Sequence, residues 1–392
     1  MKINSVILWY VLSLAALSSC ISVAATNLFL ALGVLFFLLL LYKKEIDACS
    51  LVSAMGSKLM LMFFGVLILS CIVGLNTTLS IREIWQVYIY RMLPFFLAGG
   101  LYKKINKKQF EVLFLCLFSS LTITSIVAIY QFLNGIFRPS GLSSHYMHLG
   151  GYYVIILPVF LIFLLDNISL DWFRHKTVLA IPFVVCIAGF IANNTRGAWL
   201  TVGLMSVMVL FVLGIRNPKK LCCGIVAIAL CASCIVNNKY LLQRVKSITS
   251  TTNQSNVERT LIWGSAFRMI SDYPILGVGP GCFTNLYQKK YISPKAKEPD
   301  LRHCHNLFLQ ITTENGILGI ISFLILHIYF IWYGLVNYIK DKKYTAIAIA
   351  SIVLGVLLHG MTEFNASVFK DMWLMIGMCY WTLFNEYKFD HH

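Results

Sequence analysis

The sequence predicts an all-α integral membrane protein, and three observations lead to that class. Of the 392 residues, 58% are hydrophobic and only 12% are charged, and the mean hydropathy is +0.76. Apolar runs recur along the whole chain, and most approach the roughly 20 residues that a helix needs to cross a bilayer. Lysine-rich connections separate several of these runs. Together these features exclude a soluble globular enzyme.

Twelve apolar runs are expected to form transmembrane helices. Their ranges are 5–24, 26–42, 59–76, 84–102, 110–133, 149–165, 178–193, 198–214, 221–237, 305–339, 344–361 and 372–387. The runs divide the chain into transmembrane helices 1–9 in residues 1–237, a long loop in residues 238–304, and transmembrane helices 10–12 in residues 305–392. The expected fold is a bundle of about twelve spans with one long extramembrane loop before the tenth.

The distribution of lysine and arginine predicts how the bundle is oriented. One set of connections is rich in these residues: Lys43, Lys44, Lys58, Lys103, Lys104, Lys107, Lys108, Arg174, Lys176, Arg216, Lys219, Lys220, Lys340, Lys342 and Lys343. Because cytoplasmic loops carry an excess of such residues, this side and both termini are expected to be cytoplasmic. Residues 134–148, 192–197, 238–304 and 362–371 then lie on the external side.

The external loop, residues 238–304, contributes much of the net charge of +16. A basic loop beside a bilayer attracts anionic head groups or phosphorylated glycolipids, although a solvated loop that is merely basic would have the same composition. Its segment NVERTLIWGSAFRMI has the pattern of a short amphipathic helix that lies along the membrane surface. Nucleic acid is not an expected partner, because no nucleic-acid-binding motif is present and the loop faces away from the cytoplasm.

The segment RHCHNLFLQITTENGILG, which contains His305, has the composition of a site at the mouth of the tenth span. On one continuous helix, at about 100° per residue, His305, Thr312, Gly316 and Gly319 would lie within roughly 60° of each other. The two glycines would let a neighbouring helix or a lipid tail approach closely. A titratable side chain above such a groove suggests chemistry on a lipid-linked substrate.

Three arginines are candidates for binding phosphate. Arg196, in NNTRGAWL, lies at the external interface, where its planar guanidinium suits phosphate oxygens; an interfacial anchor capped by carbonyls is the alternative. Arg259 lies next to Glu258, so a surface ion pair of little energetic value is the alternative there. Arg268 is the reserve candidate. Other external polar residues that could line a site are Arg138, His145, His148, Glu298, Asp300, Glu363 and Asp371.

His305 is interpreted as a general base, because an imidazole titrates near pH 6.5 and accepts a hydroxyl proton at neutral pH. A structural histidine and a metal ligand are the alternatives. His303 is close, but no external cluster of acids or thiolates has the spacing of metal ligands, so no metal is expected. Cys304 could form a disulfide with Cys282 if the external side is oxidising, and spacing alone leaves this open.

These residues suggest one mechanism. Arg196 and Arg259 would hold a diphosphate that links a glycan to a lipid, and His305 would deprotonate an acceptor hydroxyl. The hydroxyl oxygen would attack the anomeric carbon from the opposite face, and arginine would neutralise the departing lipid diphosphate. No cofactor is expected, because the activated bond is already in the substrate.

Three motifs in order resemble the O-antigen ligase and polymerase superfamily: TRGAWL with Arg196, VERTLIWGSAFRMISDYPILGVGPGCF with Arg259, and HN-x9-GILG with His305. The resemblance implies a metal-independent, inverting glycosyltransferase of the bacterial inner membrane. Its donor would be a glycan linked to undecaprenyl diphosphate, used at the periplasmic face. The same resemblance assigns diphosphate binding to the two arginines and general-base catalysis to His305. Further residues expected near the site are Asn306, Gly316, Gly319, Arg268 and Arg138.

Within the superfamily we expect an O-antigen ligase that acts on lipid A-core. The sequence has no added C-terminal domain, which favours a ligase or polymerase over the protein-modifying branch, and the basic loop suits a phosphorylated acceptor. A polymerase that extends undecaprenyl-diphosphate-linked repeat units is the alternative. A transporter or flippase would show internal repeats and helices broken near the midplane, and no clear repeat is present. A non-catalytic scaffold would tolerate replacement of His305.

Overall fold

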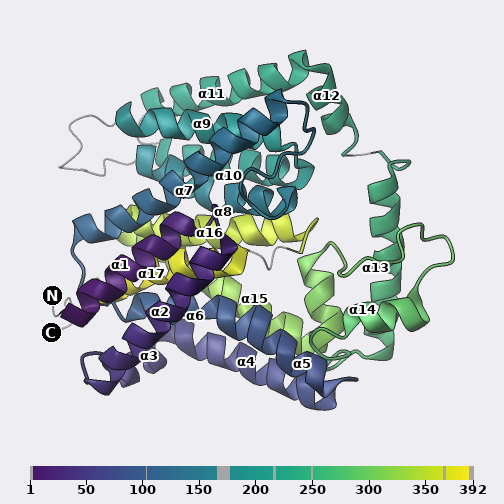
Figure 1. Cartoon of the computed structure of the whole chain (residues 1–392), viewed down its shortest axis with the longest axis horizontal. Helices are drawn as coiled ribbons and strands as arrows, with labels where there is room; N and C mark the ends of the chain where they lie inside the picture. The colour runs from purple at the N-terminus through teal and green to yellow at the C-terminus, as the bar shows by residue number, and fades with distance from the viewer. Residues whose placement is uncertain are drawn as a thin grey trace.

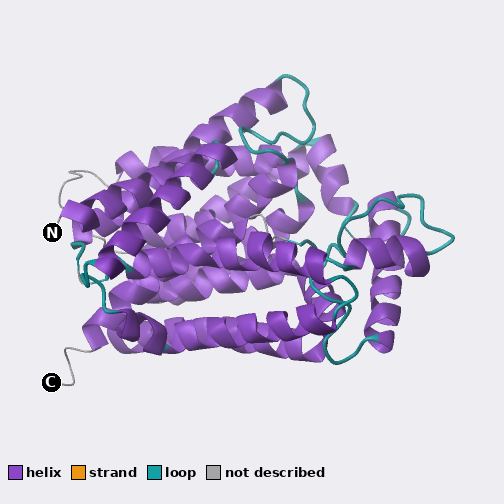
Figure 2. Cartoon of the chain, turned by 60° about the horizontal axis from the view of Figure 1, so that its bottom comes forward, coloured by secondary structure: helices purple, strands orange, loops and turns teal. Residues whose placement is uncertain are grey.

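In the computed structural model the chain folds into a bundle of helices with a smaller helical extension at one end (Figure 1). The structure describes residues 3–102, 104–165, 177–214, 218–248, 250–364 and 368–387. Within these ranges every regular element is a helix, and Figure 2 shows helices joined only by loops. The predicted all-α class is confirmed.

The elements follow one another in three groups. The bundle begins with α1 (Ile3–Ser18), α2 (Val23–Tyr42), α3 (Ala48–Ser53), α4 (Met55–Val73), α5 (Thr77–Glu83), the π-helical segment η1 (Ile84–Ile89), α6 (Tyr90–Gly99), α7 (Lys107–Leu133), α8 (Tyr146–Leu165), α9 (Thr177–Asn193), α10 (Arg196–Gly214) and α11 (Pro218–Asn237). The extension contains α12 (Lys239–Lys246), α13 (Gln254–Asp272), α14 (Phe283–Leu286) and the π-helical segment η2 (Tyr287–Tyr291). The chain then returns to the bundle with α15 (Leu307–Asp341), α16 (Tyr344–Gly360) and α17 (Phe369–Tyr387).

The apolar runs of the sequence coincide with helices of the bundle. Six helices in the described part of the chain are long and apolar enough to cross a membrane: α2, α4, α7, α8, α10 and α15. Shorter apolar helices lie within α1, α9 and α16. These lengths and compositions are those of a multi-pass membrane protein, while the count of twelve spans stays a prediction. Lys103, Arg174, Lys176 and Arg216, which contributed to the predicted orientation, lie outside the described residues.

Polar side chains fix where several helices begin. Asn106 and Gln109 form a capping box at the start of α7, in which each side chain accepts a hydrogen bond from the other residue's backbone N–H. Ser22 caps α2 by accepting a hydrogen bond from the N–H of Ala25 at 3.3 Å. Such caps satisfy N–H groups that have no partner inside the helix, and each stabilises a helix by about 1 kcal/mol.

The last helices of the chain pack in the middle of the bundle. α16 packs against α8, α15 and α17, and α17 packs against α6. Aromatic side chains fill the contact between α6 and α17, where the Trp381 indole N–H donates to the carbonyl of Phe95 at 2.9 Å. The loop that joins α16 to α17 therefore emerges from the centre of the bundle. It emerges at the end that faces the extension (Figure 1).

The extension has a small hydrophobic core of its own. Ile262, Ala266 and Met269 of α13 pack there against Phe283 and Tyr287. The amphipathic segment predicted from the sequence is a helix, α13. This helix runs across the end of the bundle (Figure 1). Its placement along a membrane surface remains a prediction.

The tenth predicted span differs from the single continuous helix expected from its sequence. Gly316 has φ 64° and ψ −164°, which interrupts the helical path inside α15. At this break the N–H of Ile317 donates to the carbonyl of Pro274 at 2.8 Å, and the N–H of Leu318 donates to the carbonyl of Ile275 at 3.3 Å. The loop after α13 is thereby hydrogen-bonded into the bundle, and the predicted stripe of His305, Gly316 and Gly319 is wrong.

Gly316→Ala should lower the free energy of unfolding by about 2–4 kcal/mol, because both the backbone and the packing exclude a side chain. An added Cβ would lie 2.2 Å from the carbonyl carbon of Ile275. Thermal unfolding in detergent measures the effect. Gly264→Ala in α13 is the matched control, since its Cβ meets nothing within 4 Å, and it should be neutral or slightly stabilising. Equal melting temperatures for Gly316→Ala and the wild type would contradict the break in α15.

Candidate functional site

His305 lies just before α15 in a backbone conformation that few side chains adopt. Its φ is 49°, in the left-handed region, and α15 begins two residues later at Leu307. Asn306 caps that helix by accepting from the N–H of Leu309 at 3.0 Å, and its amide donates to the carbonyl of Met361 at 3.0 Å. Strained residues of this kind persist where the surrounding structure holds them, and they cluster at functional sites.

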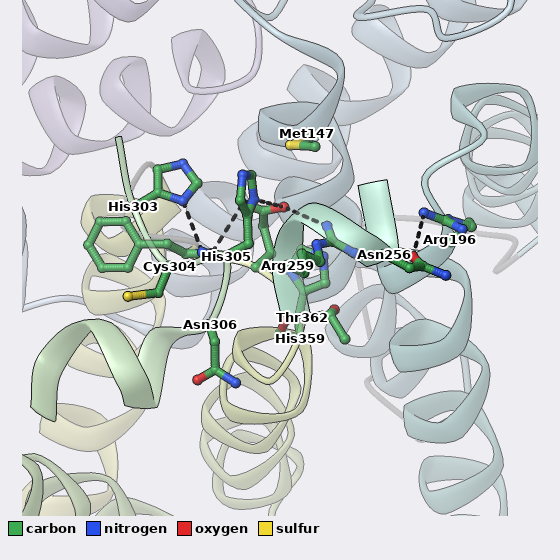
Figure 3. Close-up of polar contacts among 12 residues, drawn as sticks. Met147, Arg196, Asn256, Arg259, His303, Cys304, His305, Asn306, His359 and Thr362 are labelled. Atoms are coloured by element: carbon green, nitrogen blue, oxygen red, sulfur yellow. Dashed lines mark hydrogen bonds and ion pairs between the residues drawn. The ribbon is translucent and has the colours of Figure 1, made fainter. Parts of the chain in front are cut away.

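The histidine belongs to a row of three interacting side chains from three segments. Nδ1 of His305 lies 3.1 Å from Oε1 of Glu363, in the loop between α16 and α17. Nη2 of Arg259, on α13, lies 3.5 Å from Oε2 of the same carboxylate. Figure 3 shows His305 and Arg259 side by side in the loop region above α16. Glu363 is therefore the link between the candidate base and one candidate phosphate-binding arginine.

Neighbouring charges keep this carboxylate ionised although it is buried. Burial alone would raise the pKa of Glu363, but the hydrogen bond from His305 and the charges of His305, His303 and Arg259 lower it to about 2. Burial lowers the pKa of His303 to about 4, and the charge of His305 acts in the same direction. At neutral pH, His303 is therefore neutral and Glu363 is negative.

Arg196 is the first residue of α10 and is 9% exposed. Its Nη1 donates to the carbonyl and to the hydroxyl of Ser247, and its Nη2 donates to Oδ1 of Asn256 at 3.2 Å (Figure 3). The next residue, Gly197, allows α10 to approach the end of α16, since a Cβ there would lie 2.7 Å from Oγ1 of Thr362. The polar segment NNTRG thus places a guanidinium beside the loop that carries Glu363.

These side chains line two hollows in the protein. A cavity of about 600 Å³ is lined by both Arg196 and Arg259, together with other residues of α13 and with Ile248, Ser250 and Thr251. A smaller one of about 40 Å³ is lined by Arg138, Arg196, Arg244, Arg259 and Glu363. The two arginines predicted to bind a diphosphate therefore share one cavity. They also share a smaller hollow with the carboxylate that holds His305.

The arginine cluster, defined as Arg138, Arg196, Arg244 and Arg259, carries more positive charge than its surroundings neutralise. Among the described residues, Glu363 is the one carboxylate that lines the smaller hollow. Arg138 donates to the phenol oxygen of Tyr146, and Arg244 donates to the carbonyl of Asn194, so both have neutral partners. Burial and then the neighbouring Arg138 and Arg196 lower the pKa of Arg244 to about 10. This excess of partly buried positive charge is the electrostatic property expected of an anion site.

One further polar atom in the site has no partner. Nε of Arg259 is buried and makes no hydrogen bond with any described residue. A buried donor without a partner costs free energy, so such an atom in a native structure calls for an explanation. An acceptor supplied by a bound ligand would satisfy it.

Three other residues predicted near the site, Arg268, Gly316 and Gly319, make contacts that hold parts of the protein together. Arg268 donates to Oγ of Ser265 at 3.2 Å and to the carbonyl of Tyr291 at 2.8 Å, which ties α13 to η2. Gly316 packs against the backbone of Ile275, and the nearest heavy atom to a Cβ on Gly319 would belong to Asn315. Neither glycine lines the two hollows. Their small size serves contacts within the protein rather than a lipid groove.

The disulfide considered between Cys282 and Cys304 does not form in this structure, since both residues are buried free thiols. Sγ of Cys282 lies 3.7 Å from Oγ of Ser80 and 3.8 Å from the carbonyl oxygen of Asn76. Cys304 belongs instead to the small core of the extension. Its carbonyl accepts from the indole N–H of Trp263 at 2.8 Å, which links the residue before His305 to α13. Packing and this hydrogen bond, rather than a disulfide, hold the segment before His305 in place.

No sequence motif marks the role of Glu363, although this residue was among the polar residues predicted to be external. It stands 58 residues after His305, and no local pattern connects the two. Arg244 lies in the basic external loop, residues 238–304, and no motif distinguishes it from the other basic residues there.

Three side chains could together hold a metal ion. The ligand atoms of His303, His305 and Glu363 lie within 4.8 Å of one another, and two histidines with a glutamate form a known type of catalytic zinc site. Against this reading, the carboxylate already pairs with Arg259, whose positive charge opposes a second cation at the same place.

Comparisons with known proteins point to one family. Residues 181–324 match the family described as O-antigen ligase. A Rickettsia conorii protein named as a candidate polysaccharide ligase is 30% identical over 142 residues, which cover 34% of this chain and 31% of that protein. The aligned part thus spans about a third of the relative's length. The matched family region includes Arg196, Arg259 and His305, which supports the resemblance drawn from the sequence motifs.

Glu363→Gln should reduce stability most at neutral pH. A carboxyl whose pKa falls on folding stabilises the protein above its unfolded pKa, and this contribution is lost as the pH falls toward the folded value. The ordinary value is 4.5 and the folded value about 2. The difference in melting temperature between wild type and Glu363→Gln should therefore shrink as the pH falls below about 4.5.

Melting temperatures in detergent between pH 7 and pH 3 test this expectation. Asp300→Asn is a matched control, because Asp300 is exposed on the extension and its replacement should change little at any pH. A difference for Glu363→Gln that stays constant over the whole range would contradict the ion pairs around Glu363.

Proposed function

We propose that this chain, whose residues 181–324 match the O-antigen ligase family, is an O-antigen ligase. It would act as an inverting, metal-independent glycosyltransferase at the periplasmic face of the bacterial inner membrane, with both termini in the cytoplasm. The donor would be O-antigen polysaccharide on undecaprenyl diphosphate, and the acceptor would be lipid A-core. The observation that carries the proposal is the His305–Glu363–Arg259 row beside the cavity that Arg196 and Arg259 line.

The donor diphosphate fits the arginine cluster by charge and by shape. A guanidinium offers planar pairs of N–H donors that match phosphate oxygens, and it stays charged at any working pH. Arg196 and Arg259 line a cavity of about 600 Å³, which offers room for a diphosphate and the first sugar. The diphosphate would also balance a cluster in which four arginines face one carboxylate in the described part of the smaller hollow.

The His305–Glu363 pair suits proton abstraction. If Nδ1–H of His305 donates to Glu363, Nε2 carries a lone pair and can accept a proton from the acceptor hydroxyl. The hydroxyl oxygen then forms a bond to the anomeric carbon while the bond from that carbon to the phosphate oxygen breaks. The electron pair stays on undecaprenyl diphosphate, whose negative charge the arginines stabilise. Glu363 stabilises the imidazolium until the proton leaves to water.

This scheme requires no metal, although His303, His305 and Glu363 could hold one. In the proposal, the guanidinium groups supply the positive charge that a divalent cation supplies in other glycan transferases. The neutral state of His303 at neutral pH, which follows from its pKa of about 4, leaves it as a packing partner of His305. Their ring centroids are 4.3 Å apart.

In a strain that lacks this gene, wild type should restore lipopolysaccharide with O-antigen, whereas His305→Ala and Arg196→Ala should not. Loss of a general base typically costs about 10²–10⁴-fold in rate, which is enough to abolish the O-antigen ladder on a gel. Lipid-linked O-antigen polymer should accumulate in the variants. Arg302→Ala is the control, because Arg302 is exposed on the extension, and it should restore the full ladder.

Each variant must reach the membrane at the wild-type level, measured by immunoblot. A core that carries a single repeat unit in the gene-deficient strain would identify a polymerase instead of a ligase. Full ladders from both His305→Ala and Arg196→Ala would refute the catalytic assignment altogether.

Transfer by the purified protein should be insensitive to EDTA and to 1,10-phenanthroline. The physical reason is that the arginines, rather than a metal, neutralise the leaving diphosphate. The assay measures sugar transfer from lipid-linked donor to core acceptor after metal removal. Activity that disappears on chelation and returns with Zn²⁺ would show that His303, His305 and Glu363 form a metal site.

A further inference from the structure

A second polar cavity, of about 420 Å³, opens at the same end of the bundle and is not used in the mechanism above. It is lined by residues 19–23, by Trp85 and Gln86 of η1, by residues 142–144 and by Arg91, His148 and Lys370. Tyr146 and Met147 line the smaller hollow of the arginine cluster. One short segment, residues 142–148, therefore separates the second cavity from the arginine cluster.

The permanently charged side chains that line this cavity are the cations Arg91 and Lys370. Arg91 makes no hydrogen bond or ion pair with any described residue, although it is partly buried. Lys370 is only 5% exposed, and its Nζ lies 3.3 Å from Oδ1 of Asn27. That amide oxygen also accepts from the hydroxyl of Tyr90 at 2.8 Å. Two cations thus line one cavity.

No carboxylate from the described residues lines this cavity. Asp371 follows Lys370 in the chain but is itself 2% exposed and does not line it. The carboxylates of Glu83 and Asp371 interact electrostatically with Arg91 and Lys370, but neither carboxylate lines the cavity, so the charge that the lining presents is positive. An anion that enters the cavity would form charge-assisted hydrogen bonds with both cations.

The rim of the cavity is apolar. Trp85 is 63% exposed and Val23 is 48% exposed, and both line the cavity. Trp85 belongs to η1, and π-helical segments are frequent at functional sites. A ligand with an anionic head and a lipid attachment would match cations at the base and apolar side chains at the rim.

We propose that the cavity around Arg91 and Lys370 binds an anionic phosphate group on the sugar head of the acceptor glycolipid. The inference rests on the proposed function, because an inverting transfer requires the acceptor and the leaving diphosphate on opposite sides of the anomeric carbon. The second cavity is a candidate for the acceptor side because residues 142–148 contribute both to its lining and to that of the arginine cluster, which places the two sites next to each other. Arg91 and Lys370 are specificity-determining residues in this assignment and take no part in the chemical step.

The test is a binding measurement on the full-length protein in nanodiscs made of neutral lipid. The probe is a short core oligosaccharide that carries one phosphate, compared by calorimetry with the same oligosaccharide after phosphatase treatment. Wild type should bind the phosphorylated form roughly 10- to 100-fold more tightly, as hydrogen bonds to a charged group imply. Arg91→Gln and Lys370→Gln should lose most of this preference.

Two control variants make the result specific. Arg82→Gln removes one positive charge from an exposed residue of α5 outside the cavity, and it should keep the full preference for phosphate. Lys370→Arg retains the charge and should keep most of it, which excludes a folding defect. Equal affinity of the wild type for both oligosaccharides, or an equal loss in Arg82→Gln, would overturn the proposal.

The source of the phosphate is tested by competition. Nanodiscs that contain phosphatidylglycerol should leave oligosaccharide binding unchanged. Displacement of the oligosaccharide by phosphatidylglycerol would show a general anionic-lipid site and would overturn the assignment to the acceptor.

A transfer assay on the same samples separates this inference from the proposed function. Arg196→Ala should lose transfer while keeping phosphate-dependent binding of the acceptor. Phosphate-dependent binding through Arg91 without any transfer by the wild type would support the site and refute the ligase. Transfer by the wild type together with binding that ignores Arg91 and Lys370 would refute the site and leave the ligase intact.

Discussion

The contact of Glu363 with His305 and Arg259 is the interaction on which the rest of this site depends. It joins three segments that are distant in sequence: the start of α15, the loop after α16 and the extension helix α13. A buried carboxylate is stable only when its charge is matched. Arg259 and His305 therefore hold the Glu363 carboxylate in position, and Glu363 in turn holds both of these side chains in position. Removing Glu363 or Arg259 would leave the charge of the other unbalanced, and removing His305 would take a hydrogen bond from the carboxylate.

The backbone around the site has two features that bring these side chains together. The break at Gly316 lets the loop after α13 hydrogen-bond into α15, which holds the extension against the bundle. The small residue Gly197 lets the start of α10 reach Thr362, next to Glu363. A Cβ at either position would come too close to its neighbours. The geometry of the arginine cluster therefore depends on one glycine beside the site, Gly197, and on one that lines neither hollow, Gly316.

Much of the fold was predictable because each transmembrane helix has its own local signal, a long apolar run. The candidate residues Arg196, Arg259 and His305 were likewise marked by local motifs. The partners of these residues could not be read from the sequence, since Glu363 meets His305 across 58 positions and only tertiary packing brings them together. The helical stripe through His305 was wrong for a related reason, because periodicity cannot show that Gly316 adopts a non-helical conformation.

The most direct test of the account is a structure of the protein bound to undecaprenyl diphosphate. The account predicts phosphate oxygens within hydrogen-bonding distance of both Arg196 and Arg259, with the terminal phosphate facing Nε2 of His305. A diphosphate bound to Arg91 and Lys370, or a metal ion held by His303, His305 and Glu363, would contradict it.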